Sequence, residues 1–319
     1  MSRRLNILFL GGAKRVAVGK IILASAEKRG IDARIFGYEL DVRVPLAAIG
    51  TIIPGKKWVD PDFSNHLEAV VNEYGINMLL PFVDGAIAPA AQFAASHPGV
   101  ACPGSSREVA EQFFDKCISA EIFAKASLPI PHTLTDLDNP LFPLIAKPRR
   151  GSASKGIEIL TSGEALDRLR PVADKYLIQQ YIPDATEITV DCYVASDGRI
   201  LAVSPRIRLE TAGGEAVRTE TIDSPEAVTL AERTINATGL RGACTIQLLR
   251  DSADNLMIME INPRLGGGVV ASVNAGADIP SLIVDEWAGL PVDRTFPSPG
   301  VLTVRYLEDI AFLPDGTKI

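Results

Sequence analysis

The chain has 319 residues, of which 47% are hydrophobic and 22% are charged, and its formal net charge is -7. This composition is typical of a soluble globular protein, and the length suggests about two or three domains. The acidic balance disfavours nucleic-acid binding, which requires a broad basic surface. The four cysteines form no CxxC pair, so a zinc site is not expected and a reduced cytoplasmic setting is the default interpretation.

The first hundred residues alternate apolar strands with helices. The apolar run at residues 5–10 is too short for a signal-peptide core or a membrane span, so we expect a buried strand and no membrane partner. The pattern predicts a parallel sheet covered by helices, with ligands at the carboxyl ends of its strands. The expected strands are 6–10, 33–38 and 78–81, the expected helices are 16–28 and 66–74, and the residues near strand ends are Gly11, Glu39, Asp41 and Asp84.

The pattern changes in the second part of the chain. Residues 108–126 have helical spacing and precede Pro129 and Pro131, so one helix is expected there. From residue 144 strand-like segments follow one another, which is typical of an α+β region. They cover residues 144–147, 157–160, 176–181, 188–194 and 200–203. The break near residues 103–108 is interpreted as a domain boundary.

The strongest candidate site lies in the expected strand at residues 259–264. Alternate side chains of a strand share a face, so Glu260, Asn262 and Arg264 should point one way and Ile261 toward a core. Two oxygen donors at this spacing suit a hard cation such as Mg²⁺, and an arginine beside them suits a phosphate. An ordinary polar sheet face is the alternative.

A predicted hairpin adds a further polar residue to this face. Residues 251–255 are interpreted as its turn, and a turn centred between Ala253 and Asp254 pairs Gln247 with Glu260. The side-chain oxygen of Gln247 is then a candidate metal ligand. A slip of one residue would turn Gln247 to the other face, and a plain cross-strand polar pair is the alternative.

Small and basic residues follow the expected strand at 144–147. Lys147 ends that strand, and the loop after Pro148 can bring backbone N–H groups close to phosphates. The loop lacks the GK[ST] ending of a Walker A motif, and a plain surface loop is the alternative. Its candidate phosphate-binding residues are Gly151, Ser152, Ser154 and Gly156.

Residues 177–183 and the strand that follows them form another candidate region. The backbone of the first segment can act as a hinge that hydrogen-bonds a purine edge. Glu187 lies seven residues after Gln180, where its carboxylate can accept hydrogen bonds from ribose hydroxyls. Two ordinary amphipathic strands are the alternative.

Together these motifs resemble the ATP-grasp superfamily. The features that occur in family order and at family-like spacing are Lys116, Lys147, the segment from Gln180 to Glu187, Gln247 and Glu260-x-Asn262-x-Arg264. The resemblance is nearest to the synthetase units of the carbamoyl-phosphate synthase large subunit and to small amino-acid ligases built on that plan. It covers nearly the whole chain, and the N-terminal part resembles a pre-ATP-grasp domain in its Pro45, Pro81 and Asp84.

The resemblance implies an α/β fold that becomes α+β in the catalytic part. A Rossmann-like pre-ATP-grasp domain at residues 1–105 would precede a two-subdomain ATP-grasp domain at residues 106–319. Within the second domain, a lid subdomain would cover about 129–183 and a catalytic subdomain about 184–319.

The resemblance also implies an enzyme that uses ATP and Mg²⁺, with Mn²⁺ as an alternative metal. In that family a substrate carboxylate attacks the γ-phosphorus, and an amine, or a thiol, then attacks the acyl phosphate. The expected partners are therefore a small-molecule carboxylate and amine, and a homodimer is a further expectation because relatives are often dimers. Neither nucleic acid nor a membrane is expected as a partner.

Roles for single residues follow from the same resemblance. Lys116 and Lys147 would bind phosphates, and Glu187 would take the ribose. Arg264, together with Lys116, would be catalytic and would steady the transferring phosphoryl group. Adenine would be lined by Gln180, Tyr181 and Ile182, and metal would be held by Gln247, Glu260 and Asn262.

Substrate residues are less clearly marked in the sequence. Arg206 and Arg208 lie on one expected strand face and are candidates for binding a substrate carboxylate or the acyl phosphate, with a solvated face as the alternative. Asp84 and Gly267 are further candidates, the latter because residues 266–268 follow Arg264 and are expected to shape the acceptor pocket.

Three other functions are alternatives to a carboxylate–amine ligase. A carbamoyl-phosphate-synthase-like unit would act on bicarbonate or carbamate, but this chain lacks the extra domains of those larger relatives. A nucleotide-binding subunit without turnover is disfavoured because the motif residues are intact. An NAD-binding protein rests on Gly11 and Gly12 alone.

Overall fold

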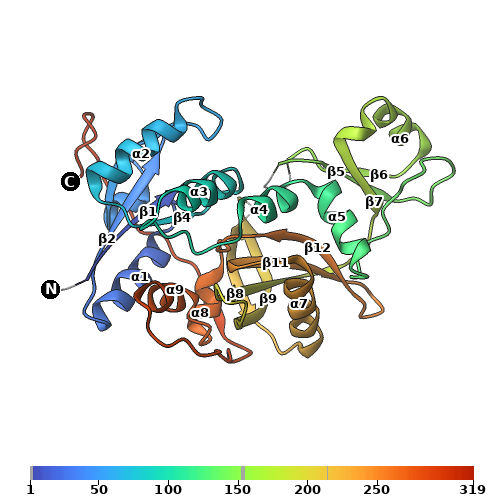
Figure 1. The fold of residues 1–319 in the computed structure, drawn as a ribbon. Helices are drawn as coiled ribbons and strands as arrows, with labels where there is room; N and C mark the ends of the chain where they lie inside the picture. The colour runs from blue at the N-terminus through green and yellow to red at the C-terminus, as the bar shows by residue number, and fades with distance from the viewer. Residues whose placement is uncertain (1–2, 152–154, 214) are drawn as a thin grey trace.

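The computed structural model describes residues 3–151, 155–213 and 215–319, and within these ranges the strands form three sheets. Figure 1 shows the three sheets in a row, with the second sheet between the first and the third. The first sheet is parallel and the other two are antiparallel. The predicted mixed α/β fold with an antiparallel second part is therefore confirmed.

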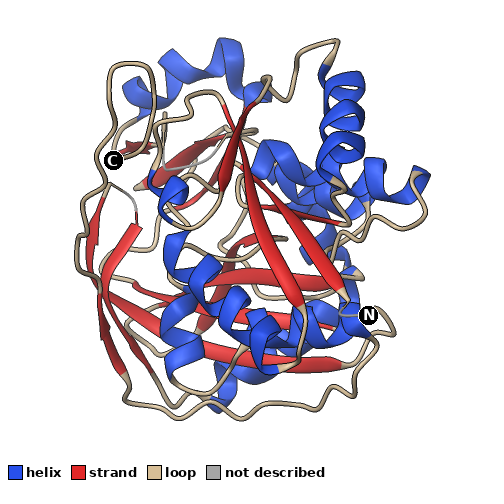
Figure 2. Ribbon diagram, turned by 90° about the vertical axis from the view of Figure 1, so that its left-hand side faces the viewer, coloured by secondary structure: helices blue, strands red, loops and turns tan. Residues whose placement is uncertain are grey.

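The first sheet is buried on both faces by helices (Figure 2). Successive residues of its central strand alternate between two cores, with Phe9 under α1 and Leu10 under α2 and α3. This double burial explains the continuous apolar run at residues 5–10. The strand order is β3-β2-β1-β4, and the elements are β1 (Arg4–Leu10), α1 (Val16–Lys28), β2 (Asp32–Glu39), a 3₁₀ turn (Pro45–Ala48), β3 (Thr51–Pro54), α2 (Phe63–Tyr74), β4 (Met78–Pro81) and α3 (Asp84–Ser96).

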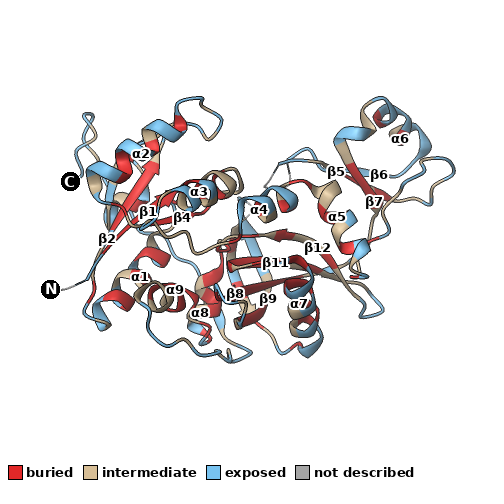
Figure 3. Ribbon diagram, in the orientation of Figure 1, coloured by how far each residue is buried: buried red, intermediate tan, exposed pale blue. Residues whose placement is uncertain are grey.

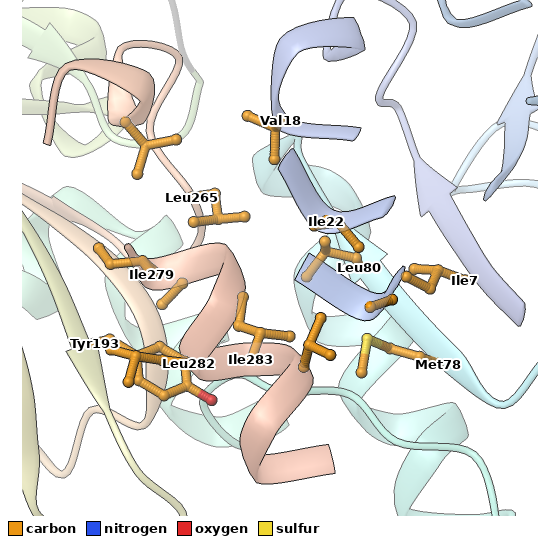
Figure 4. Packing of buried hydrophobic residues seen from close by; sticks show 14 of the residues in the cluster. Ile7, Val18, Ile22, Met78, Leu80, Tyr193, Leu265, Ile279, Leu282 and Ile283 are labelled. Atoms are coloured by element: carbon orange, nitrogen blue, oxygen red, sulfur yellow. The ribbon is translucent and has the colours of Figure 1, made fainter. Parts of the chain in front are cut away.

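Two helices from the far end of the chain, α8 (Val269–Asn274) and α9 (Ile279–Ala288), complete the core of the first sheet. Figure 4 shows Leu282 and Ile283 of α9 on one side of this core, with Ile22 of α1 and Leu80 of β4 across from them. Tyr193 of the second sheet belongs to the same cluster. One apolar core thus joins the first sheet to the second.

The second sheet is amphipathic, with α7 on its apolar face. Ile246 and Leu248 point into the core beside α7, whereas Thr245 and Gln247 point to the opposite, polar face. The strand predicted at 200–203 is much longer because it pairs with neighbours on both sides. The strand order is β12-β11-β8-β9-β10-β13, and the elements are β8 (Thr186–Val194), β9 (Ile200–Ala212), β10 (Glu215–Thr221), α7 (Pro225–Thr238), β11 (Gly242–Arg250), β12 (Leu256–Asn262) and β13 (Leu302–Val304).

The third sheet has its own small core beneath α6. Leu144 and Ala146 of the middle strand pack against Leu166, and the alternate side chain of Lys147 points to the other face. The strand order is β6-β5-β7, and the elements are β5 (Leu144–Pro148), β6 (Glu158–Leu160), α6 (Gly163–Leu169), a 3₁₀ segment (Arg170–Lys175) and β7 (Tyr176–Gln180). The domain and subdomain boundaries predicted from the sequence stay predictions.

The single helix predicted at 108–126 is wrong, because Asp115 divides it into α4 (Arg107–Phe114) and α5 (Lys116–Lys125). The backbone of Asp115 is extended, and its carboxylate accepts hydrogen bonds from the N–H groups of Cys117 and Ile118. A carboxylate that caps a new helix in this way competes with continuation of the preceding one. The break places Lys116 at the first position of α5.

Buried residues concentrate on the strands and on the inner sides of the helices (Figure 3). None of the helices in the described ranges combines the length and apolar character that crossing a bilayer requires.

Replacing Ile283 tests the shared core. Ile283→Ala should lower the free energy of unfolding by about 2–5 kcal/mol, because it leaves a cavity where the side chain is 0% exposed. Chemical denaturation of variant and wild type measures the change. Leu307→Ala is the control, since Leu307 is 93% exposed, and it should change stability by less than about 0.5 kcal/mol. Equal stabilities of the Ile283 variant and the wild type would contradict the shared core.

Candidate active site

A cavity of about 690 Å³ lies where the three sheets meet, a size typical of small-molecule sites. Its walls come from the loops after β1 and β4, from α5, β5 and β7, and from the polar face of the second sheet. Most site residues proposed from the sequence line it: Asp84, Lys116, Lys147, Gly151, Gln180, Tyr181, Ile182, Glu187, Arg206, Arg208, Gln247, Glu260, Asn262, Arg264 and Gly267.

The predicted phosphate loop is only partly represented in this cavity. Gly156 is not among the lining residues; its φ is +73°, and a Cβ there would lie 3.1 Å from the Pro148 side chain. Its expected contact with phosphate stays a prediction. Ser152 and Ser154 lie outside the described residues.

The β11–β12 hairpin places Gln247 opposite Glu260, the pair that the sequence predicts. The turn itself differs, since Arg250 pairs with Leu256 and the turn is centred half a residue earlier than expected. A β-bulge at Met259 compensates by adding one residue to β12. The predicted pairing of Gln247 with Glu260 is therefore confirmed, but it depends on the bulge as well as on the turn.

Three side chains on this hairpin form the candidate metal site. The Asn262 amide donates to Oε1 of Glu260 at 3.1 Å and to Oε1 of Gln247 at 3.3 Å. The two acceptor oxygens therefore converge on the amide nitrogen of Asn262. Carboxylate and amide oxygens are ligands that suit a hard cation. Among the described residues no three His, Cys, Asp or Glu side chains cluster.

Arg264 lies beside this cluster and is held by Asp84 of α3 and Asn262 of β12. Its Nε donates to Oδ1 of Asp84 at 2.6 Å, and its Nη2 donates to Oδ1 of Asn262 at 3.2 Å. Asp84 is the first residue of α3, immediately after the loop that follows β4. The carboxylate proposed from the sequence as a substrate contact is thus engaged with an arginine of the chain itself.

Lys147 is 6% exposed and points into the cavity from β5. Its Nζ donates to Oε1 of Gln179 at 3.2 Å. Burial lowers the pKa of Lys147 to about 8, against the charge of Glu260, which acts to raise it, and with that of Lys116, which lowers it further. An anionic ligand beside Lys147 would therefore stabilise its charged form.

Lys116 approaches the cavity from the start of α5. Its Nζ donates to the carbonyl oxygen of Gly151 at 2.8 Å, and its backbone N–H donates to the carbonyl of Arg149 at 2.9 Å. Arg149 and Arg150, basic residues of the predicted phosphate loop, both pair with the buried carboxylate of Asp115. Asp115 therefore fixes the base of this loop, a role that the sequence analysis missed.

The expected adenine segment is already hydrogen-bonded within the protein. The N–H of Gln180 donates to the His132 carbonyl at 2.8 Å, and that of Tyr181 donates to the Pro143 carbonyl at 3.1 Å. A purine edge must therefore be met by other backbone groups of this segment. Ile182, next along the chain, also lines the cavity.

The two arginines of β9 have different partners on β8. Arg208 pairs with Glu187, the expected ribose residue, and both line the cavity. Arg206 is buried and donates through Nε to Oδ2 of Asp191 at 2.7 Å. The two arginines share a strand face, as predicted, but each is paired with a different carboxylate of β8.

One further arginine was missed from the sequence. Arg15, at the N-cap of α1, lines the cavity and forms an ion pair with Glu215 at 3.0 Å. Gly267 lies next to this pair, since a Cβ on it would be 3.5 Å from the Arg15 guanidinium. The position of Arg15 just after the first strand was the available signal. Glu39 and Asp41, which follow the second strand, do not line the cavity.

Comparison with known proteins identifies relatives of this fold. Residues 173–310 match the family described as ATP-grasp in the biosynthetic pathway with Ter operon. No match was found among curated protein sequences.

Several solved structures are similar over most of the chain. N5-carboxyaminoimidazole synthetase from Staphylococcus aureus, complexed with ADP, has a TM-score of 0.73 at 16% identity, covering 93% of this chain and 81% of that one. The biotin carboxylase domain of Hydrogenobacter thermophilus 2-oxoglutarate carboxylase, with MgADP and bicarbonate, has a TM-score of 0.72 at 19% identity, covering 91% and 71%. The L-amino acid ligase from Bacillus licheniformis has a TM-score of 0.68 at 17% identity, covering 92% and 76%. The chain therefore shares its fold with these proteins, and residues 173–310 match an ATP-grasp family.

Proposed function

We propose that the chain is an ATP- and Mg²⁺-dependent ligase that activates a carboxylate as an acyl phosphate and passes it to an amine, releasing ADP and phosphate. One observation carries this proposal: two lysines, an oxygen-donor cluster and Arg264 all face a single cavity. The similar solved structures, which include an L-amino acid ligase and proteins solved with ADP, support the same reaction class.

The nucleotide would lie along the third sheet and the polar face of the second. Lys147 and Lys116 would contact its phosphates, with Gly151 at the base of the loop beside them. Gln180, Tyr181 and Ile182 would line the adenine, and Glu187 the ribose. The cluster of Gln247, Glu260 and Asn262 would hold Mg²⁺, which when bound neutralises charge on the β- and γ-phosphates.

The chemistry would proceed in two displacements. A carboxylate oxygen of the substrate attacks the γ-phosphorus as the bond from that phosphorus to ADP breaks. The amine nitrogen then attacks the carbonyl carbon, and phosphate leaves. Arg264 would bind the oxygens of the transferring phosphoryl group, where a positioned guanidinium has its largest effect in the transition state. The cavity walls would keep water from the acyl phosphate.

An ADP-release screen over pairs of carboxylates and amines tests this proposal. ADP should appear only when ATP, Mg²⁺ and a productive pair are all present, and mass spectrometry should find a condensed product lacking one water. A thiol acceptor belongs in the same panel. Tight ATP binding without ADP release for any pair would favour a nucleotide-binding subunit, and carbamoyl phosphate formed from bicarbonate would favour the synthase-like alternative.

The metal assignment makes a separate prediction. Glu260→Gln should raise the Mg²⁺ concentration needed for half-maximal ADP release by about tenfold or more, because the cluster loses its one formal negative charge. Thermal melting without ligands should change little, since Glu260 faces the cavity. Glu158→Gln, an exposed change on the third sheet, is the matched control. An unaltered Mg²⁺ dependence in the Glu260 variant would rule out this site.

The two basic residues should fail in different ways. Lys147→Ala should mainly raise KM for ATP, because its contact with a phosphate exists before and during reaction. Arg264→Ala should mainly lower kcat, by about 10²–10³, because its contact strengthens as charge moves onto the transferring group. Steady-state kinetics on both variants measure the split. The catalytic role of Arg264 is wrong if its variant keeps kcat and only raises KM.

A further inference from the structure

The ion pair between Arg264 and Asp84 joins residues 180 positions apart in the sequence, one just after β12 of the second sheet and one just after β4 of the first. Both side chains line the cavity, and their exposures are 17% and 15%. The Nε–Oδ1 distance of 2.6 Å is that of a charge-assisted hydrogen bond. Neither sheet alone contains the arrangement.

The hydrogen bonds of the Arg264 guanidinium leave a defined set of donors free. Nε is used by Asp84, one N–H of Nη2 by Asn262, and one N–H of Nη1 by the carbonyl of Leu265 at 3.3 Å. A guanidinium has five N–H groups, so one N–H on each terminal nitrogen has no partner among the described residues. Two such N–H groups can donate to two oxygens of a phosphoryl group or carboxylate.

The backbone around Asp84 is held on both sides by close packing. A Cβ on Gly11 would lie 2.6 Å from Cγ2 of Val83, the residue before Asp84. A Cβ on Gly85, the residue after it, would lie 3.0 Å from the ring of Trp58. The first turn of a helix also favours a carboxylate through its dipole. Asp84 is thus a fixed anchor.

The other end of the pair is also fixed. The Arg264 backbone N–H donates to the Asn262 carbonyl at 2.8 Å, and the Thr245 hydroxyl donates to the Arg264 carbonyl at 3.2 Å. With both ends of the pair held in place, the direction of the guanidinium depends on its hydrogen bonds, of which the one to Asp84 is the shortest.

We propose that Asp84 is the positioning residue for Arg264: it sets the guanidinium so that its two free N–H groups face the transferring phosphoryl group. This inference rests on the proposed function, because it takes Arg264 as the residue that contacts that group. It assigns the first sheet a part in the chemistry through one carboxylate. It also replaces the direct substrate contact expected of Asp84 from the sequence.

A double-mutant cycle tests the proposal, with ADP release measured on the best carboxylate–amine pair of the screen. Asp84→Asn should lower kcat about ten- to hundredfold with KM for ATP nearly unchanged, because the arginine loses its orientation rather than its charge. In an Arg264→Ala background the same change should have no further effect on kcat. Asp84→Glu, which keeps the charge, should restore part of the lost rate.

Asp285→Asn is the matched control. Asp285 pairs with Arg29 between α9 and α1, joins the same two parts of the chain, and is 14% exposed, but it lies away from the cavity. Its replacement should lower the melting temperature and leave kcat unchanged. An equal fall in kcat for both aspartate variants would mean that Asp84 acts only on stability and would overturn the proposal.

Two further results would also overturn it. One is an Asp84→Asn effect that adds in full to that of Arg264→Ala, since the residues would then act independently. The other is an unchanged or higher kcat for Asp84→Asn alone, since the ion pair would then be no aid to turnover. Failure of the proposed function gives a different result, in which the wild-type chain releases no ADP with any pair or Arg264→Ala leaves kcat intact.

Discussion

The packing of α9 against α1 is the contact on which the candidate site depends. Ile283 of α9 has no exposed surface, and its cluster contains side chains from β1, β4 and β8. The loops after β1 and β4 are therefore fixed relative to the second sheet by an apolar core. Arg15 ends the first of those loops, and Asp84 begins the helix after the second; their partners Glu215 and Arg264 belong to the other side of the cavity. Burial of apolar surface has no directional preference, but here it fixes the distance between the partners of each ion pair, whose hydrogen bonds are directional.

The arginines that line the cavity are held by carboxylates from neighbouring elements. Arg206 pairs with Asp191 and Arg264 with Asp84, and in each pair the acid lies on a different element from the base. Pairing lowers the free-energy cost of burying each charge and removes most of the rotamer freedom of a long side chain. The site is therefore largely arranged before any ligand enters, which is the condition under which electrostatic stabilisation costs no reorganisation.

The sequence predicted well what depends on local periodicity. Alternation at two-residue spacing places Glu260 and Asn262 on one face of β12 and Ile261 on the other. Apolar strands that alternate with helices predict the parallel first sheet. It failed where one side chain overrides a periodic pattern. Asp115 ends a helix that the apolar spacing would continue, because its carboxylate caps the next turn. The bulge at Met259 leaves no trace in the alternation of apolar residues.

Long-range partners were beyond the sequence for a different reason. Nothing local to Asp84 specifies that its carboxylate meets Arg264, because the contact follows from how two sheets pack. The same holds for Gln179, whose side chain meets Lys147 across two strands of the third sheet. The sequence thus indicates what each residue can do chemically. Which acid pairs with which base depends on tertiary packing.

The carboxylate of Asp115 has a mechanical consequence for any movement of the third sheet. It is 0% exposed, caps α5 and binds Arg149, while the N–H of Arg149 donates to the Lys175 carbonyl just before β7. Sliding the sheet away from α5 would separate the buried carboxylate of Asp115 from its counter-ion Arg149, which is unfavourable. The helix and the sheet should therefore travel as one rigid body. Lys116, at the first position of that helix, would then keep its distance to β5 and Lys147 through any opening or closing, so both ammonium groups would reach or leave a bound phosphate in a single concerted step.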